Sequence, residues 1–166
     1  MRTARRRLPL LLALLVAACN PPDPANLDAG TSASRVQIFL VAIEDGSIPG
    51  PEAGCTGNVV PVEVDLPAPS PALEGSLTSL LTAGDGYQRA GFYNALANSP
   101  LRIERIERAG NTARVYLEGY LELGGNCDGS RILSQLTETV TQFGDVETAE
   151  LFLAGKPLRE LLAGRR

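Results

Sequence analysis

The sequence contains no histidine among its 166 residues. A Ser-His-Asp triad or a Cys-His pair is therefore impossible, and the commonest protein ligand of zinc is absent. The glycine-rich segment 124–129 has neither the lysine of a phosphate loop nor the spaced glycines of a dinucleotide-binding turn, so an anion site there is the weaker interpretation. We predict no metal site and no cofactor.

Basic residues are in the minority. The chain has 15 lysines and arginines against 19 aspartates and glutamates. Loss of residues 1–18 would remove four arginines and no acidic residue, which leaves 11 basic and 19 acidic residues and a net charge of −8. Such a charge opposes attraction to nucleic acid and to anionic lipid. We therefore predict no nucleic-acid partner.

The apolar run near the N-terminus, residues 8–18, is too short for the roughly 20 residues that span a bilayer. It follows three consecutive arginines, an order typical of a secretory signal. The run ends in Val-Ala-Ala-Cys, which resembles the lipobox of bacterial lipoproteins. That resemblance implies that residues 1–18 are a lipoprotein signal peptide and that Cys19 is acylated. An ordinary signal peptide with a chance cysteine is the alternative.

Residues 19–34 contain one large apolar side chain, Leu27, too little to build a core, and they are rich in proline, alanine and small polar residues. We interpret them as a flexible tether with an average span of about 20 Å. Residues 35–166 then form one compact domain. Together these segments predict an extracytoplasmic protein that its lipid anchors to a bacterial membrane.

Two cysteines remain beside Cys19. In an exported protein whose third cysteine is lipidated, they make an even set in an oxidising compartment. We therefore predict a disulfide between Cys55 and Cys127, since both are expected near the same end of the sheet. Closing so long a loop stabilises a fold by about 4 kcal/mol in the chain-entropy model.

The domain alternates between strand and helix patterns. In residues 112–123 apolar and polar side chains alternate, as in a strand with one buried face, whereas Ile132, Leu136 and Val140 recur at helical spacing. The expected strands are 36–43, 58–66, 101–108, 112–123 and 148–154, and the expected helices are 70–84, 87–97 and 128–144.

This order predicts an α/β fold of the α+β type. We expect a mixed, largely antiparallel sheet of four to five strands, with the two main helices packed on one face.

Five segments occur in a characteristic order: VVPVEV, LLTAG, ARVYLEG, SQLTETVTQFGDV and AELFLAGKPL. Together they resemble the GerMN domain, named from sporulation and spore-germination proteins. The resemblance covers residues 35–162 in a single copy. It implies an extracytoplasmic module similar to the ring-building domains of secretion and sporulation assemblies, often carried by lipoproteins and without a known enzymatic reaction.

The polar face of residues 112–123 offers a candidate binding surface. Aromatic and arginine side chains are enriched in interface cores. The candidate residues are Arg114, Tyr116, Glu118 and Tyr120, with Glu63, Asp65 and Phe152 as additional members. The competing interpretation is an ordinary set of cross-strand pairs on a solvated face.

These residues predict a non-catalytic binding or assembly module of the cell envelope. Its partner would be another protein or a second copy, with peptidoglycan as a further candidate. The alternative is a cell-envelope enzyme that acts on glycan or peptide through the loop carboxylates Glu44, Asp45 and Glu52. These carboxylates lack the spacing of a calcium loop, and a solvated loop is the simpler interpretation.

Overall fold

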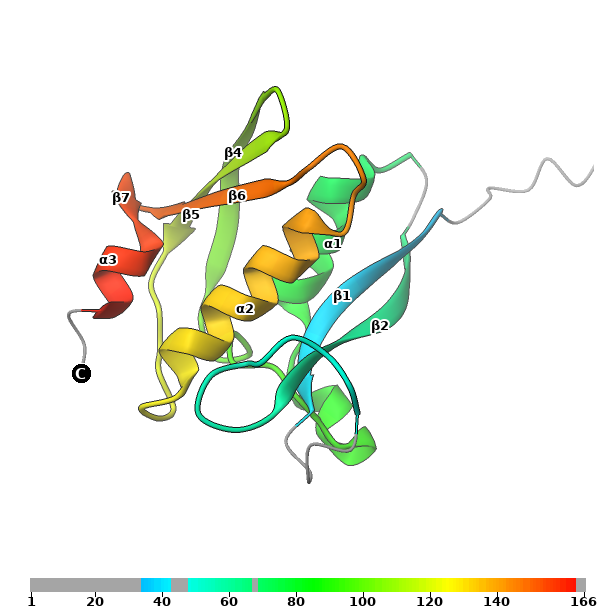
Figure 1. Ribbon diagram of the computed structural model, residues 1–166, viewed down its shortest axis with the longest axis vertical. Coiled ribbons are helices and arrows are strands. Elements are labelled where there is room, and N and C mark those ends of the chain that lie inside the picture. Colours follow the sequence, from blue (N-terminus) through cyan, green and yellow to red (C-terminus); the bar gives the residue numbers. More distant parts are fainter. Residues whose placement is uncertain (1–33, 43–47, 67–68, 164–166) are drawn as a thin grey trace, which may run out of the picture. The chain divides into compact units, whose positions relative to one another are not determined.

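The computed structural model describes residues 34–42, 48–66 and 69–163 (Figure 1). Cys19, the signal segment, the tether up to residue 33 and the carboxylates Glu44 and Asp45 lie outside the described residues.

The strands form two sheets (Figure 1). The first has the order β2-β1-β3 and is antiparallel throughout. The second has the order β4-β5-β6-β7, in which β5 and β6 are parallel and the other pairs antiparallel. The strands are β1 (Ser34–Ala42), β2 (Asn58–Leu66), β3 (Phe92–Tyr93), β4 (Leu101–Ala109), β5 (Thr112–Gly119), β6 (Thr148–Leu153) and β7 (Lys156–Pro157).

Helices connect the two sheets. Helix α1 contacts β1, β2 and β4, helix α2 contacts β1, β2 and β6, and the two helices contact each other. The helices are α1 (Ala72–Thr82), α2 (Asp128–Thr141) and α3 (Leu158–Ala163), with a 3₁₀ helix, η2 (Asp85–Ala90). None of the helices in the described ranges has the length and apolar character needed to cross a membrane.

The predicted α+β class is confirmed, but the strands are divided between two sheets instead of sharing one. The edge of β1 shows why. Gln37 N–H donates to Gln142 Oε1 (3.2 Å) and Phe39 N–H donates to Thr139 Oγ1 (3.1 Å), while Gln135 Nε2 donates to Phe39 O (2.9 Å). Side chains of α2 thus satisfy backbone groups that a neighbouring strand would otherwise pair, so no strand of the second sheet pairs with this part of β1.

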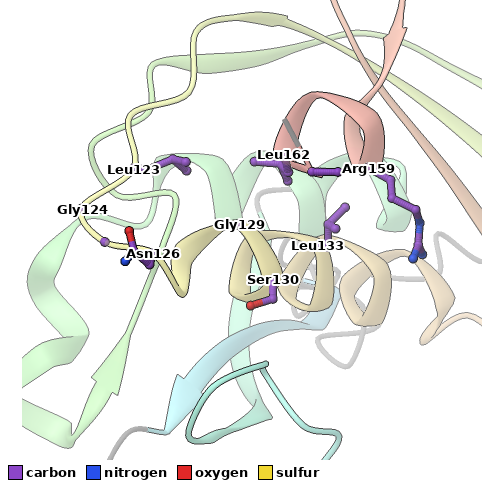
Figure 2. A pocket seen from close by; sticks show the side chains of 10 residues that line it. Leu123, Gly124, Asn126, Gly129, Ser130, Leu133, Arg159 and Leu162 are labelled. Carbon is purple, nitrogen blue, oxygen red and sulfur yellow. The ribbon is translucent and has the colours of Figure 1, made fainter. Parts of the chain in front are cut away.

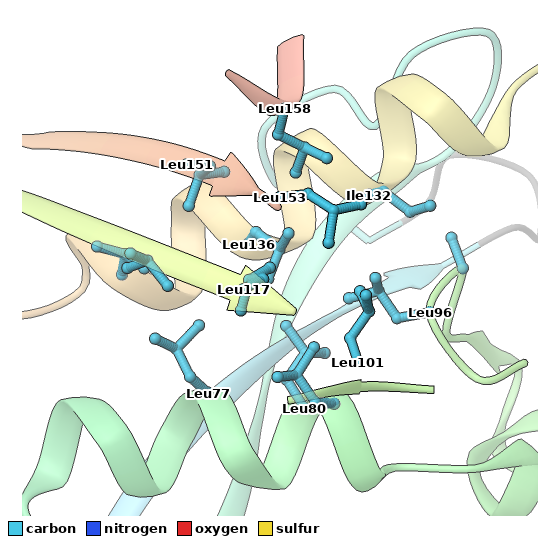
Figure 3. Close-up of a cluster of buried hydrophobic side chains, with 14 of the residues drawn as sticks. Leu77, Leu80, Leu96, Leu101, Leu117, Ile132, Leu136, Leu151, Leu153 and Leu158 are labelled. Atoms are coloured by element: carbon cyan, nitrogen blue, oxygen red, sulfur yellow. The ribbon is translucent and has the colours of Figure 1, made fainter. Parts of the chain in front are cut away.

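A single large core lies between α1, α2 and the inner face of β5 (Figure 3). Along β5 every second residue is fully buried, as the sequence alternation predicts. Leucines of both helices and of β6 point into the same space in Figure 3. The labelled core residues include Leu77, Leu80, Leu117, Ile132, Leu136, Leu153 and Leu158.

Two predicted elements differ from the structure. Residues 87–97 are not one helix, because Gly91 has a φ of +81° and ends η2 before the short strand β3. The predicted strand 112–123 ends at Gly119, whose φ is +115°. A Cβ at Gly119 would overlap the Pro100 carbonyl oxygen, so the chain turns here and the alternation stops.

Candidate functional site

The side chains of β4, β5 and β6 that point away from the core form one surface, here called the outer face. Its centre follows from strand register: Arg114 lies opposite Glu150, and Tyr116 lies opposite Phe152. The buried residues of β5 alternate with these, so the outer face is the side of the sheet opposite the helices. Arg114, Tyr116 and Glu118 all lie on it, as predicted from the sequence.

An aromatic stack occupies the middle of the outer face. The rings of Tyr116 and Phe152 are 4.8 Å apart and almost parallel, with 12° between their planes. The Arg105 guanidinium carbon lies 3.5 Å from the centroid of the Tyr116 ring. Three strands therefore contribute to one arginine–tyrosine–phenylalanine cluster, a combination that protein interfaces favour.

Ion pairs surround this stack. Arg114 Nε lies 2.7 Å from Glu150 and Arg105 Nε lies 2.9 Å from Glu107. The Tyr116 hydroxyl donates to Glu107 at 3.3 Å. The hydrogen bond from Arg105 lowers the pKa of the Glu107 carboxyl below its ordinary value. The Arg114–Glu150 pair crosses from β5 to β6 and the Arg105–Glu107 pair lies within β4, so both arginines beside the stack have a carboxylate partner.

Glu118 is also on the outer face and forms an ion pair with Arg102. Tyr120 follows the end of β5, is 61% exposed and does not belong to the strand ladder. Glu63 and Asp65 are on β2 of the other sheet, where both lie 3.5 Å from Arg35. The structure therefore unites Arg114, Tyr116, Glu118 and Phe152, and it places Glu63 and Asp65 in a different sheet.

Arg105 was missed by the sequence interpretation. The register of β4 shifts between Ile103 and Arg105, so a β-bulge brings Arg105 to the outer face. A signal was available, because Ile103 and Ile106 are three residues apart and cannot share one face of a regular strand.

Cys55 and Cys127 form a disulfide, with Cα atoms 5.8 Å apart. That separation is within the usual range for such a bridge. The bridge attaches the loop before β2 to the residue that precedes α2. Beside it, Arg131 donates to the carbonyl oxygen of Thr56 at 3.4 Å.

A carboxylate occupies the start of α2. Asp128 is 2% exposed, accepts a hydrogen bond from the Tyr93 hydroxyl (3.1 Å) and lies 3.5 Å from Arg131. Burial, and next the Asp128 charge, raise the pKa of the Tyr93 hydroxyl. A negative charge at this helix end opposes a bound anion, which weakens the anion interpretation of residues 124–129 further.

The glycine-rich loop borders a hollow of about 480 Å³ (Figure 2). Leu123, Leu133 and Leu162 supply apolar walls, and Arg159 lies at its edge. Across the described residues, no group of three or more cysteine, aspartate or glutamate side chains is arranged to hold a metal ion. Of the loop carboxylates, only Glu52 belongs to the described part of the chain, and it is exposed.

The fold and its surfaces define a small two-sheet α+β module. The chain belongs to the family described as "Germane: Sporulation and spore germination", whose model matches residues 49–159. The resemblance to GerMN domains is thereby confirmed.

Two solved structures from Bacillus subtilis are similar to this chain. The first GerMN domain of the sporulation protein GerM is 19% identical, with a TM-score of 0.54, and the match covers 75% of this chain and 85% of that one. The tandem GerMN domains of GerM are 12% identical, with a TM-score of 0.57, and the match covers 79% of this chain and 42% of that one. These likenesses show the fold. No curated protein matches the sequence.

Proposed function

We propose that this protein is an extracytoplasmic lipoprotein of the bacterial cell envelope, whose GerMN domain is a non-catalytic binding or assembly module. The observation that carries the proposal is the cluster of Arg105, Tyr116 and Phe152 on the outer face. A protein partner docks there, and the acylated Cys19 holds the domain near the membrane.

The geometry of the cluster supports docking. Tyr116 is already stacked and hydrogen-bonded, so little side-chain entropy is lost when a partner covers it. The surrounding arginines and glutamates supply a polar rim that fixes orientation. Of the three carboxylates in the enzyme alternative, Glu52 is exposed, and Glu44 and Asp45 lie outside the described residues.

Cys19→Ser is expected to release the protein from membranes or to stall its processing, because the thiol that accepts lipid is lost. Fractionation of cells, with mass spectrometry of the mature N-terminus, checks this. The matched control is Cys55→Ser, which removes a thiol of the disulfide and leaves the lipobox intact. A mature chain that begins elsewhere and carries an unmodified Cys19 contradicts the prediction.

Tyr116→Ser combined with Tyr120→Ser is expected to weaken partner binding about tenfold or more, because truncated interface aromatics typically cost over 1 kcal/mol. Crosslinking in intact cells, followed by identification and quantification of the captured partner, measures the loss. The free energy of unfolding should fall by only about 1 kcal/mol, since the Tyr116 contacts with Phe152 and Arg105 are at the surface.

Tyr87→Ser is the matched control, because Tyr87 is half-buried on η2, away from the outer face. It should leave the captured partner unchanged. Unaltered capture by the double variant would remove the outer face as the docking site, and so would a double variant that unfolds.

A further inference from the structure

Strand β6 has an unpartnered edge. Strand β5 lies on one side of it, while on the other side β7 pairs only with Phe152 and Leu153. Thr148 N–H donates to Asn111 O (3.2 Å) and Ala154 N–H donates to Leu117 O (3.0 Å). Even-numbered residues of β6 therefore direct their backbone groups toward β5. Ala149 and Leu151 direct theirs to the open edge, where the described part of the chain supplies no strand.

A groove runs along this edge. One hollow, of about 430 Å³, lies between α2 and β6 and includes Ala149 and Leu151 in its wall. A second, of about 410 Å³, continues over α2 toward Glu52. Leu133, Thr137 and Arg159 line both hollows, so the two adjoin, and together they are here called the α2 groove.

The charges that line the α2 groove favour one kind of occupant. Glu52, Glu138 and Glu160 line it, and within the described ranges none of them forms an ion pair. Glu150, which also lines the groove, forms an ion pair with Arg114. Arg159 supplies the positive charge among the residues that line the groove. Three carboxylates against one guanidinium favour a basic partner.

A second copy fits this groove poorly. It would bring the same carboxylates, and the chain carries 19 acidic against 15 basic residues even with its N-terminal arginines included. Like charges placed opposite each other cost several kcal/mol at an interface. A helix is also a poor occupant, because its backbone groups are bonded internally and cannot pair with Ala149 and Leu151.

We propose that the α2 groove binds an extended, basic peptide segment of a partner protein. The segment adds as a strand to the edge of β6 through the backbone of Ala149 and Leu151. Its lysine or arginine side chains lie against Glu138 and Glu160. The α2 groove borders the outer face, because Glu150 and Phe152 belong to that face and also line the groove. The proposal uses the backbone of Ala149 and Leu151 and does not depend on the docking proposed at the outer face.

The test uses the full chain in neutral detergent and a peptide with fluorescein at its N-terminus, fluorescein-Lys-Val-Lys-Val-Lys-Val-Lys-amide. Binding is followed by fluorescence anisotropy, and amide exchange is followed by NMR. The wild-type chain should bind this peptide and not its glutamate counterpart, and the amides of Ala149 and Leu151 should exchange at least tenfold more slowly in the complex.

Ala149→Pro removes a backbone donor at an edge position, where proline is tolerated, and should weaken binding at least tenfold. Ala149→Val keeps the donor and should bind as the wild type does. The double variant with Glu138→Gln and Glu160→Gln leaves strand β6 intact. It should weaken peptide binding at least threefold and reduce the salt dependence of that binding.

Tyr120→Ser, at a residue that lines neither hollow, should leave peptide binding unchanged. This assay uses a peptide and not the partner captured in cells, so failure at the outer face and failure at the groove are distinguishable. The proposal is overturned by absence of binding at millimolar peptide, by equal binding of the glutamate peptide, or by full affinity in the paired glutamine variant. Dimers that form in the wild type and disappear in Ala149→Pro would assign the edge to a second copy and also overturn it.

Discussion

Replacing Cys55 and Cys127 together with serine is expected to lower the free energy of unfolding by about 4 kcal/mol. The two cysteines are 72 residues apart in sequence, and their bridge closes a loop that includes α1, β3, β4 and β5. Opening this loop returns chain entropy to the unfolded state. Urea unfolding followed by circular dichroism measures the change in midpoint and slope.

The local structure should change as well. Without the bridge, the loop before β2 loses its covalent attachment to α2 and keeps the hydrogen bond from Arg131 to Thr56 O. Amide exchange in residues 53–57 should therefore accelerate more than exchange in α2.

Cys19→Ser is the matched control, because it makes the same substitution at a cysteine outside the disulfide. It should leave the unfolding free energy of the domain unchanged. A loss below about 1 kcal/mol in the double variant would show that the bridge adds little to the native fold, against the chain-entropy estimate.

The elements that sequence periodicity defined well are those with one buried face. In β5 the alternation of Ala113, Val115 and Leu117 with polar residues identified both the core side and the outer face. In α2 the spacing of Ile132, Leu136 and Val140 identified the buried stripe. Periodicity succeeds here because each residue of these elements faces either the core or the solvent, so the polarity of its side chain indicates its side.

The division into two sheets was not predictable in this way. Gln135 and Thr139 are polar, yet both are fully buried because they bond the edge of β1. Periodicity treats such residues as a solvated helix face. Their real partners, Phe39 N–H and C=O, lie about a hundred positions away in the sequence.

The candidate surface was predicted in part. Alternation placed Tyr116 correctly, but Tyr120 is beyond the turn at Gly119, and the bulge in β4 added Arg105. Helix α3 is not predicted from the sequence, because a helix of six residues with two buried leucines is too short to show a clear helical period. Local backbone irregularities therefore decided which side chains joined the outer face.

Gln135→Met is expected to lower the free energy of unfolding by about 3 kcal/mol, although methionine has a similar volume. The Gln135 side chain is fully buried, and its Nε2 donates to Phe39 O (2.9 Å) and to Asn94 Oδ1 (3.2 Å). Its Oε1 accepts from Ala95 N–H (2.9 Å). Methionine would leave Phe39 O and Ala95 N–H without these partners, at about 1–3 kcal/mol for each group that water cannot reach, whereas Asn94 Oδ1 keeps the hydrogen bond from Leu96 N–H (3.0 Å). Urea unfolding measures the loss.

Gln142→Met is the matched control, because Gln142 makes the same kind of contact to the edge of β1 but is only half-buried. Water can replace its bonds to Gln37, so the expected loss is about 1 kcal/mol. Equal losses at the two positions would mean that burial does not set the cost. Losses well below 1 kcal/mol at both positions would mean that α2 holds β1 by apolar packing alone, and the polar contacts would then not explain why no strand pairs with β1 between Gln37 and Phe39.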